Sequence, residues 1–216
     1  MTSNSVAHIA PSPGRGRPKL HSDEQILATA LQMFATYGYE GTSLRSLNRD
    51  LGLSHSAIHQ RFGTKEDLYK AVIDHEFKSM FGEIRELFAA GPVPTEPIEV
   101  LHRHFKCFLI VSSRHPFMNR LMNNEGLEES WHLDHIYDRF VSRALSPVNQ
   151  LIEELFRKKV LKSRGVRTPF FLVAHGAAAI YTLRALSAKF DADEGPFNEE
   201  KLADDAAWII VNGLKR

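Results

Sequence analysis

The sequence has a single cysteine, no long apolar run and almost no net charge, and each shortage excludes a class of protein. With Cys107 alone among 216 residues, no internal disulfide framework can form, which is typical of a reducing compartment. The longest apolar stretches, such as residues 107–111, are far too short to span a bilayer. The polar, Pro/Gly-rich start lacks the apolar segment of a secretory signal. We therefore expect a cytoplasmic protein that does not insert into a membrane.

The sequence also lacks the motifs of the common enzyme classes. It contains no glycine-rich phosphate loop, no Gly-x-Ser-x-Gly elbow and no His-Glu-x-x-His pattern. We therefore expect neither an enzyme nor a bound cofactor. A helical enzyme without a sequence motif remains an alternative, which turnover by the isolated carboxy-terminal part would reveal.

Residues 42–53 show the pattern of a short helix that ends in a tight turn. Leu44, Leu47 and Leu51 follow one another at three- and four-residue spacing, which predicts one apolar helix face. Gly52 comes directly afterwards, where the end of a helix favours a residue that tolerates positive φ. The pattern predicts the first helix of a helix-turn-helix.

A second short helix is predicted after this turn. Ser54 is placed to cap it, and Ile58 and Phe62, four residues apart, would face the core. The side chains left on the outside are polar, small or cationic, and they suit phosphates and base edges in a DNA major groove. These candidate base-reading residues are His55, Ser56, Ala57, His59, Gln60 and Arg61.

Phosphate contacts are expected from the residues around these two helices. Thr42, Ser43 and Arg45 lie at the start of the first helix, and their side chains can bind phosphate oxygens. Lys65 falls in the first turn of the next helix, where a cation opposes the helix dipole. A phosphate contact by Lys65 would offset this unfavourable interaction with the dipole. Because the formal net charge is only +1, the positive charge that binds DNA must be local.

A basic segment precedes the predicted helices. Residues 1–21 are rich in Ser, Pro and Gly, so we expect this arm to be disordered. Within it, Arg15, Arg17 and Lys19 alternate with Gly and Pro, and this core resembles an AT-hook that inserts into a narrow minor groove. The alternative is a solvated tail without a DNA contact.

Capping patterns define the helices on either side. Ser22 with Gln25 forms a capping-box pattern at the start of a helix that Gly38 would end. Thr64 with Asp67 forms a second pattern, at the start of a long helix that runs to residue 90. The predicted arrangement is therefore a three-helix unit followed by a linking helix.

Residues 22–75 resemble the DNA-binding head of TetR-family transcriptional regulators. The resemblance joins the helix-turn-helix to a Phe62-x-x-Lys65 junction at the spacing of the family, and His59 stands where the family very often has tyrosine. The residues that carry it are Gly38, Tyr39, Gly41, Thr42, Leu44, Leu47, Leu51, Gly52, Leu53, Ser54, Ile58, Phe62 and Lys65 to Leu68. It implies a homodimer held by the last two helices of each subunit, and an effector bound in the carboxy-terminal domain.

From residue 95 onward the periodicity is helical throughout. Pro147 interrupts the helix predicted over residues 131–160, which would be kinked there or divided with Ser146 as a new cap. Thr168 and Pro169 would begin a very apolar helix, and a final helix is predicted from Asn198 to residue 213. The small residues Ala174 and 176–179 would allow another helix, from a partner chain, to approach closely, and the alternative is packing within the chain's own core.

Aromatic residues concentrate between positions 105 and 181, which indicates an apolar cavity between helices. His175 is the preferred polar anchor, because a polar ring in an apolar helix needs a hydrogen-bond partner. The alternative is that these side chains form an ordinary core. The candidate ligand-binding residues are Phe105, Phe108, Met122, Trp131, Tyr137, Phe140 and His175.

Metal sensing is a second interpretation of the same domain. His102 and His104 lie two residues apart, and His132 and His135 would share a helix face. Carboxylates lie close to the second pair, at Glu125, Glu128, Glu129 and Asp134.

The sequence as a whole predicts an all-α protein in three parts: a disordered basic arm at 1–21, a TetR-type helix-turn-helix domain at 22–68, and a helical ligand-binding and dimerisation domain at 69–216. We expect a regulator, by analogy a repressor, that binds a palindromic DNA operator as a homodimer. A small, largely apolar effector would release it. The alternative is a metal-responsive regulator.

Overall fold

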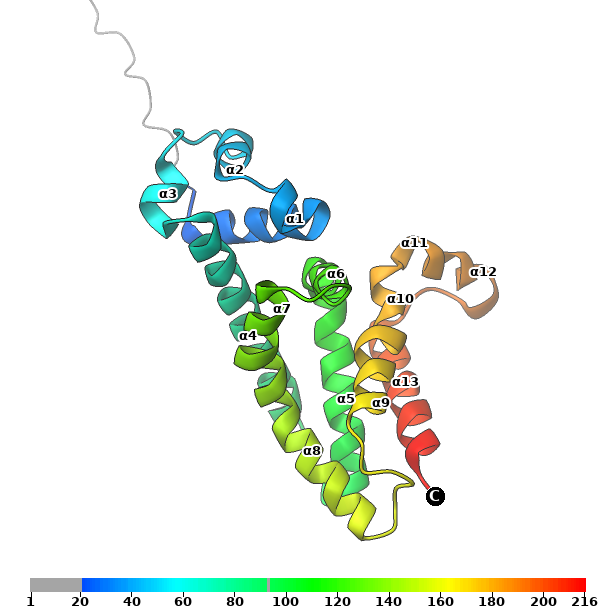
Figure 1. The fold of residues 1–216 in the computed structure, drawn as a ribbon. Coiled ribbons are helices and arrows are strands. Elements are labelled where there is room, and N and C mark those ends of the chain that lie inside the picture. Colours follow the sequence, from blue (N-terminus) through cyan, green and yellow to red (C-terminus); the bar gives the residue numbers. More distant parts are fainter. Residues whose placement is uncertain (1–20, 93) are drawn as a thin grey trace, which may run out of the picture.

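The computed structural model describes residues 21–92 and 94–216, and within these ranges the chain forms helices and no strand. Figure 1 shows a small helical head at one end, joined to a larger helical body by the long helix α4 (Lys65–Ala89). An isolated bridge between Leu161 and Lys215 is the exception to the helical pairing. The predicted all-α fold with a helix-turn-helix head is confirmed. The predicted basic arm, with Arg15, Arg17 and Lys19, lies outside the described residues.

The head consists of α1 (Asp23–Gly41), α2 (Leu44–Asp50) and α3 (Ala57–Phe62). Reciprocal capping boxes at Ser22 and Thr64 begin α1 and α4, as the sequence predicts. Gly38, with φ of 72°, interrupts α1 one turn before its end, and Gly52 makes the turn after α2 with φ of 63°. The local patterns therefore set the boundaries of the head helices.

The start of α3 corrects one expectation. Ser54 does not cap this helix, which begins at Ala57 after Ser56 without a side-chain cap bond. Instead, the buried side chain of Asn48 on α2 accepts a hydrogen bond from the Ile58 amide (3.3 Å) and donates one to the His55 carbonyl (2.9 Å). Asn48 of α2 thus provides hydrogen-bond partners for backbone groups at the start of α3 that the helix itself leaves unpaired.

The body begins with α5 (Pro97–Arg114) and α6 (Pro116–Glu125), followed by α7 (Trp131–Ile136), the π-helical turn η1 (Tyr137–Val141) and α8 (Ser142–Arg157). Pro147 lies inside α8, so the predicted division at Ser146 is wrong. The irregular turn is η1, which ends six residues before Pro147.

The carboxy-terminal part consists of short helical segments and one longer helix. The predicted cap at Thr168 is wrong, because the first segment begins at Arg167 after Val166. The segments are α9 (Arg167–Phe171), the π-helical η2 (Leu172–Ala177), α10 (Ala179–Thr182), α11 (Arg184–Ser187), the 3-10 turn η3 (Ala188–Phe190), α12 (Asp191–Glu194) and α13 (Glu199–Leu214). Asn198 caps α13 as predicted.

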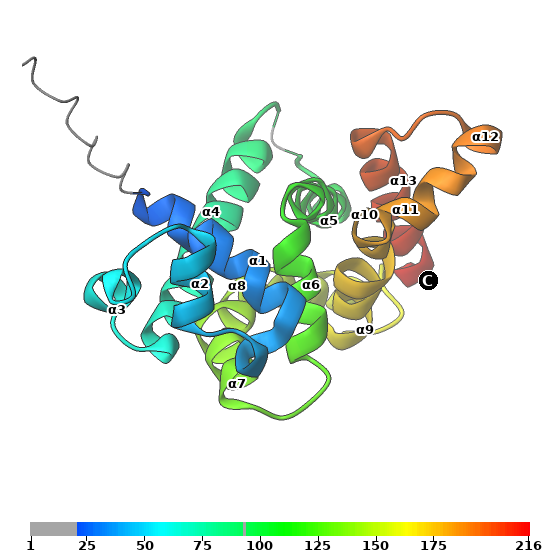
Figure 2. The ribbon, with the colours of Figure 1, turned by 90° about the horizontal axis from the view of Figure 1, so that it is seen from above.

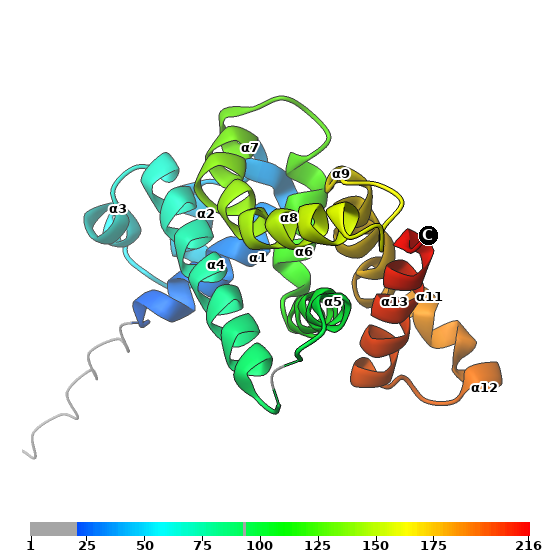
Figure 3. The same cartoon turned by 90° about the horizontal axis from the view of Figure 1, so that it is seen from below.

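Helix α5 is the centre of the body. It packs against α4 on one side and α13 on the other, and it also contacts α8 and η2. Figure 3 shows α4, α8 and α9 arranged around it, and Figure 2 shows α11 and α12 extending away from the rest. This arrangement encloses the space between α4, α5 and α8.

Two apolar cores support the molecule, and one of them crosses from the head into the body. The first core contains Ile26, Phe34, Leu47 and Ile58 of the head, and continues through α4 to Leu121 of α6. The second core lies between α5, α8, α10 and α13. The head is therefore packed directly onto the body, and α1 contacts both α4 and α6.

In the described part of the chain, no single helix is long and apolar enough to cross a membrane. The segments Arg167–Thr182 and Arg184–Glu194 reach that length and composition only when taken together, and they are bent by 70°.

Candidate DNA-binding surface and effector pocket

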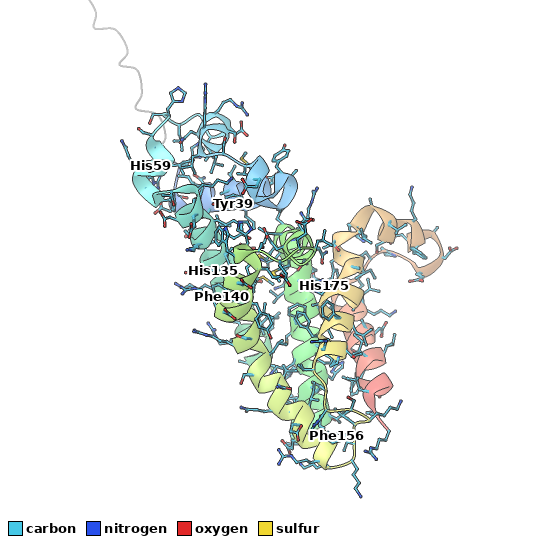
Figure 4. The ribbon with its side chains drawn as sticks, viewed as in Figure 1. Tyr39, His59, His135, Phe140, Phe156 and His175 are labelled. Atoms are coloured by element: carbon cyan, nitrogen blue, oxygen red, sulfur yellow. The ribbon has the colours of Figure 1, made fainter. Side chains whose placement is uncertain are left out.

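The outer side of α3 carries the polar residues that the sequence predicts for base contacts. His55, Ser56, His59 and Gln60 are exposed, whereas Ala57 is half-buried. Figure 4 shows His59 on the outside of α3, away from the body. The ring Nδ1 of His59 lies 2.8 Å from the Gly63 carbonyl, so this nitrogen donates and Nε2 is left to meet a ligand. Helix α3 is thus held by Asn48 on its inner side and presents polar side chains on its outer side.

Arg61 is placed differently from its neighbours on α3. Its guanidinium donates to the His21 carbonyl (2.7 Å) and forms an ion pair with Asp23, so it joins the end of α3 to the start of α1. Only 27% of its side chain is exposed. A guanine contact by Arg61 requires it to leave Asp23.

Lys65 lies at the start of α4 and is also held by the head. Its ammonium group sits 4.1 Å from the centre of the Tyr39 ring and 3.6 Å from the Glu40 carboxylate. This position keeps the cation at the junction of α1 and α4. A phosphate could replace Glu40 as its partner, since Glu40 is almost fully solvated.

The predicted phosphate contacts at the start of α2 divide into three roles. Thr42 is buried and its hydroxyl donates to the Gly38 carbonyl (2.9 Å), so the expected phosphate contact of this side chain is not supported. The Ser43 hydroxyl is exposed but caps α2 together with Ser46. Arg45 is exposed and has no ion pair within the described ranges, which leaves it as the strongest phosphate ligand of the three.

An aromatic cluster joins the head to the body, and the sequence analysis did not predict it. Tyr39 of α1, Tyr69 of α4 and Trp131 of α7 meet edge to face, with ring centres 5.3–5.7 Å apart. The Tyr69 hydroxyl donates to Glu125 of α6 (2.9 Å), and burial, followed by the charge of Glu125, raises the pKa of Tyr69. Trp131 was predicted to bind ligand, but it belongs to this junction.

A cavity of about 630 Å³ lies in the body between α4, α5, α8 and η2. Phe105, Phe108 and Phe140 line it, as the sequence predicts for an effector site. Further apolar lining comes from residues that were not among the predicted ligand-binding set: Phe77, Phe81, Ile84, Val141, Ala144, Leu145, Pro147, Val148, Val166, Pro169, Phe170, Val173 and Ala174. The volume and lining are those of a small-molecule pocket.

Four predicted ligand-binding residues lie outside this cavity. Met122 packs on the core beneath the head, Trp131 joins the aromatic cluster, and Tyr137 points to solvent. His175 of η2 is hydrogen-bonded to Asn123 of α6 (2.7 Å), so the predicted partner exists, although the ring does not face the cavity. Burial lowers the pKa of His175. Figure 4 shows His175 across the body from Phe140.

The polar lining of the cavity is basic. Arg85, His104, Arg139 and Arg143 contribute to it, and no carboxylate does within the described lining. Arg139 forms a two-point ion pair with Asp74 (2.8 and 2.6 Å), so its charge is balanced. The His104 Nδ1 donates to the Val100 carbonyl (2.8 Å).

The histidines proposed for metal binding have other partners. His102 stacks on Trp208 and faces Asp204, whereas His132 faces Glu125 and His135 faces Asp74. Among the described residues, no group of three or more His, Cys, Asp or Glu side chains could hold a metal ion.

Large apolar side chains are exposed on the last helical segments. Ile209 of α13 is 72% exposed, although the helix faces the core with Ala203, Ala207 and Val211. The other large apolar side chains that are exposed on these segments are Phe171, Leu172, Leu183, Leu186 and Phe190. We call these six residues the carboxy-terminal apolar surface.

Two short helices joined by a tight turn, with a polar face on the outside of the second, form the arrangement of a helix-turn-helix DNA-binding domain. The sequence profile described as "Bacterial regulatory proteins, tetR family" matches residues 26–72. The head of this chain is therefore similar to the DNA-binding head of TetR-family regulators, as its residues implied.

Individual relatives agree over the head. The chain is 38% identical over 79 residues to YezE of Bacillus subtilis, described as an uncharacterized HTH-type transcriptional regulator, covering 36% of this chain and 41% of that one. It is 35% identical over 75 residues to the HTH-type transcriptional repressor AcnR of Corynebacterium glutamicum, covering 35% and 40%. The match therefore spans less than half the length of these curated relatives.

The similarity of the whole fold is seen in solved structures. The TetR family transcriptional regulator PfmR of Thermus thermophilus superposes with a TM-score of 0.56 at 24% identity, covering 89% of this chain and all of that one. At this identity the likeness concerns the fold alone.

Proposed function

We propose that this protein is a repressor that binds a palindromic DNA operator as a homodimer. The observation that carries the proposal is α3: its base is fixed by Asn48, and its outer face carries only small and polar groups. A short helix with such a face, held on its inner side by the rest of the head, fits a major groove. Action on DNA also implies a cytoplasmic location.

The homodimer is proposed from the carboxy-terminal apolar surface. Exposed large apolar groups that gather on neighbouring elements mark an interaction site, and here they lie on the last helical segments. A two-fold axis at this surface would place two heads on half-sites about one DNA turn apart, roughly 34–36 Å. Residues 69–216 would then serve both for dimerisation and for ligand binding.

Release by a small, largely apolar effector is proposed from the cavity. Helix α4 supplies one wall of the cavity and begins, at Lys65, directly behind the recognition helix. A molecule that displaces this wall would therefore rotate or shift the head. In a dimer, a change in the separation of the two heads breaks their match to the half-sites.

The DNA-binding part of the proposal is tested with Arg45. Replacement by alanine should weaken binding to DNA of any sequence and reduce the slope of log affinity against log salt by about one, because one phosphate contact is lost. Fluorescence anisotropy with mixed-sequence duplexes measures both effects. Arg164→Ala, in an exposed loop of the body, is the matched control. Equal affinity and slope for both variants would contradict the proposed surface.

A further inference from the structure

The charge of the effector cavity is set by residues at its rim. Arg85 of α4 and Arg143 of α8 both line the cavity and are both exposed, which places them where the cavity meets solvent. Neither forms an ion pair among residues 21–92 and 94–216, in contrast to Arg139, which Asp74 neutralises. Two guanidinium charges are therefore left without a protein carboxylate at the opening.

The interior of the cavity is apolar, in contrast to its charged rim. Phe77, Phe81, Phe105, Phe108 and Phe140 supply aromatic walls, and aliphatic side chains supply most of the rest. His104 also lines the cavity, but its Nδ1 already donates to the Val100 carbonyl. A ligand rich in hydroxyl groups would lose its water without finding partners here.

We propose that the cavity binds an amphipathic anion: a hydrophobic chain or ring system that carries one carboxylate or a similar anionic group. The tail would occupy the phenylalanine-lined interior, while Arg85 and Arg143 would receive the anionic end from two different walls. A guanidinium is suited to this task because its donors match the geometry of a carboxylate. This inference rests on the proposed role of the cavity as the effector site.

The two rim arginines should also disfavour hydrophobic ligands with other head groups. A cationic amphiphile could contact the aromatic walls by cation–π interactions, but the rim arginines would repel its charge. A neutral amphiphile would gain the same burial of its tail without a charge-assisted hydrogen bond. The structure thus orders three head groups by affinity: anionic, then neutral, then cationic.

Three probes that share one tail test this order: dodecanoate, 1-dodecanol and dodecyltrimethylammonium, each below its micelle-forming concentration. Displacement of a neutral fluorescent probe from the full-length protein measures their affinities. We expect dodecanoate to bind about tenfold to a hundredfold more tightly than the alcohol, since a hydrogen bond to a charged group contributes on the order of 1.5–3 kcal/mol. The preference should shrink as salt is added.

Protein variants distinguish the contribution of the ligand's anionic group from that of its alkyl chain. The double variant Arg85→Gln with Arg143→Gln should lose the preference for dodecanoate and keep its affinity for 1-dodecanol. Arg164→Gln, in the exposed loop, should change neither affinity. Ala174→Trp, at a half-buried position of the cavity wall, should weaken both ligands and so report that they bind there. Equal binding of dodecanoate and dodecanol, or an unchanged preference in the double variant, would overturn the inference.

Release of bound DNA by the two ligands distinguishes a failure of this inference from a failure of the proposed function. If dodecanol and dodecanoate release DNA equally well, the effector role holds and the anionic preference is wrong. If the protein prefers dodecanoate but binds no DNA in a gel shift, the preference holds and the proposed repressor function is wrong.

Discussion

The ring of Phe140 in η1 stacks face to face on the ring of Phe77 in α4, with ring centres 4.4 Å apart and planes only 4° from parallel. One residue earlier in η1, Arg139 holds Asp74 of the same helix through two hydrogen bonds. Three of these four residues line the cavity, namely Phe77, Arg139 and Phe140. The π-helical turn therefore connects the cavity to the helix that carries the head.

Replacing Phe140 by alanine should uncouple the cavity from the head. We expect a loss of about 1–3 kcal/mol in the free energy of unfolding, because a half-buried aromatic stack is removed. DNA affinity without effector should change little, whereas release of DNA by effector should weaken. Urea denaturation and DNA anisotropy measure the two effects. Tyr137→Ala, in the same turn but exposed to solvent, is the control. Equal stability losses in the two variants would contradict the role of the stack.

Replacing Asn48 by alanine should damage DNA binding through the start of α3. Two backbone groups of residues 55 and 58 lose their partner, and we expect a cost of about 1–3 kcal/mol in the free energy of unfolding. DNA affinity should fall although Asn48 is buried and cannot touch DNA. Thermal denaturation and anisotropy test this, with the exposed Asn149→Ala as control. Wild-type DNA affinity in the Asn48 variant would show that α3 does not depend on this anchor.

The difference between Ser22 and Asn48 shows what the sequence could predict. Ser22 acts on its own helix three residues away, so a local pattern predicts the cap, and Thr64 is the same case. Asn48 acts on a helix seven to ten residues away, and nothing local distinguishes it from a surface asparagine. The Ser54 cap was wrong for that reason. The all-α fold and the head were predictable because their signals are local and periodic.

The cavity was predictable only in composition. Phe105, Phe108 and Phe140 line the cavity, but Trp131 lies at the junction with the head. Aromatic spacing shows that a side chain faces inward, whereas the helix that it meets is decided by tertiary packing. Phe77 illustrates the point, since it lines the cavity where the ring of Phe140 in η1 stacks on it.

The half-buried His115 should make the free energy of unfolding depend on pH. Its Nδ1 lies 2.6 Å from Glu76 and its Nε2 lies 2.8 Å from Glu83, whose second oxygen faces Arg114 at 3.5 Å. Burial lowers the pKa of His115, but the hydrogen bonds and charges of the two glutamates outweigh it, so the pKa is raised. A raised pKa in the folded state means that this stabilisation is complete below the ordinary histidine pKa and is lost as the pH rises through the raised value.

The variant His115→Gln isolates this effect from other titrating groups. The difference in urea midpoint between wild type and variant should be largest near about pH 6 and should shrink toward about pH 9. Other histidines act in both proteins and cancel in the difference. A difference that stays constant over this range would show that the charged form of His115 does not stabilise the fold.

Replacing Ile209 by aspartate should dissociate the proposed homodimer. Because 72% of this side chain is exposed in the single chain, the substitution should cost the isolated subunit less than about 0.5 kcal/mol. Sedimentation should show monomers, and DNA affinity should fall because two linked heads bind more tightly than one. Leu127→Asp, 80% exposed in the loop after α6 and outside the carboxy-terminal apolar surface, is the control. A dimer that survives Ile209→Asp and dissociates with Leu127→Asp would place the interface elsewhere.

Selection of bound duplexes from a random DNA pool by the full-length protein tests the central claim most directly. The account predicts enrichment of an inverted repeat whose half-site centres lie about one helical turn apart, roughly 10 base pairs, because two α3 helices related by a two-fold axis meet one face of the duplex. Recovery of sequences without two-fold symmetry, or no enrichment at all, would contradict it.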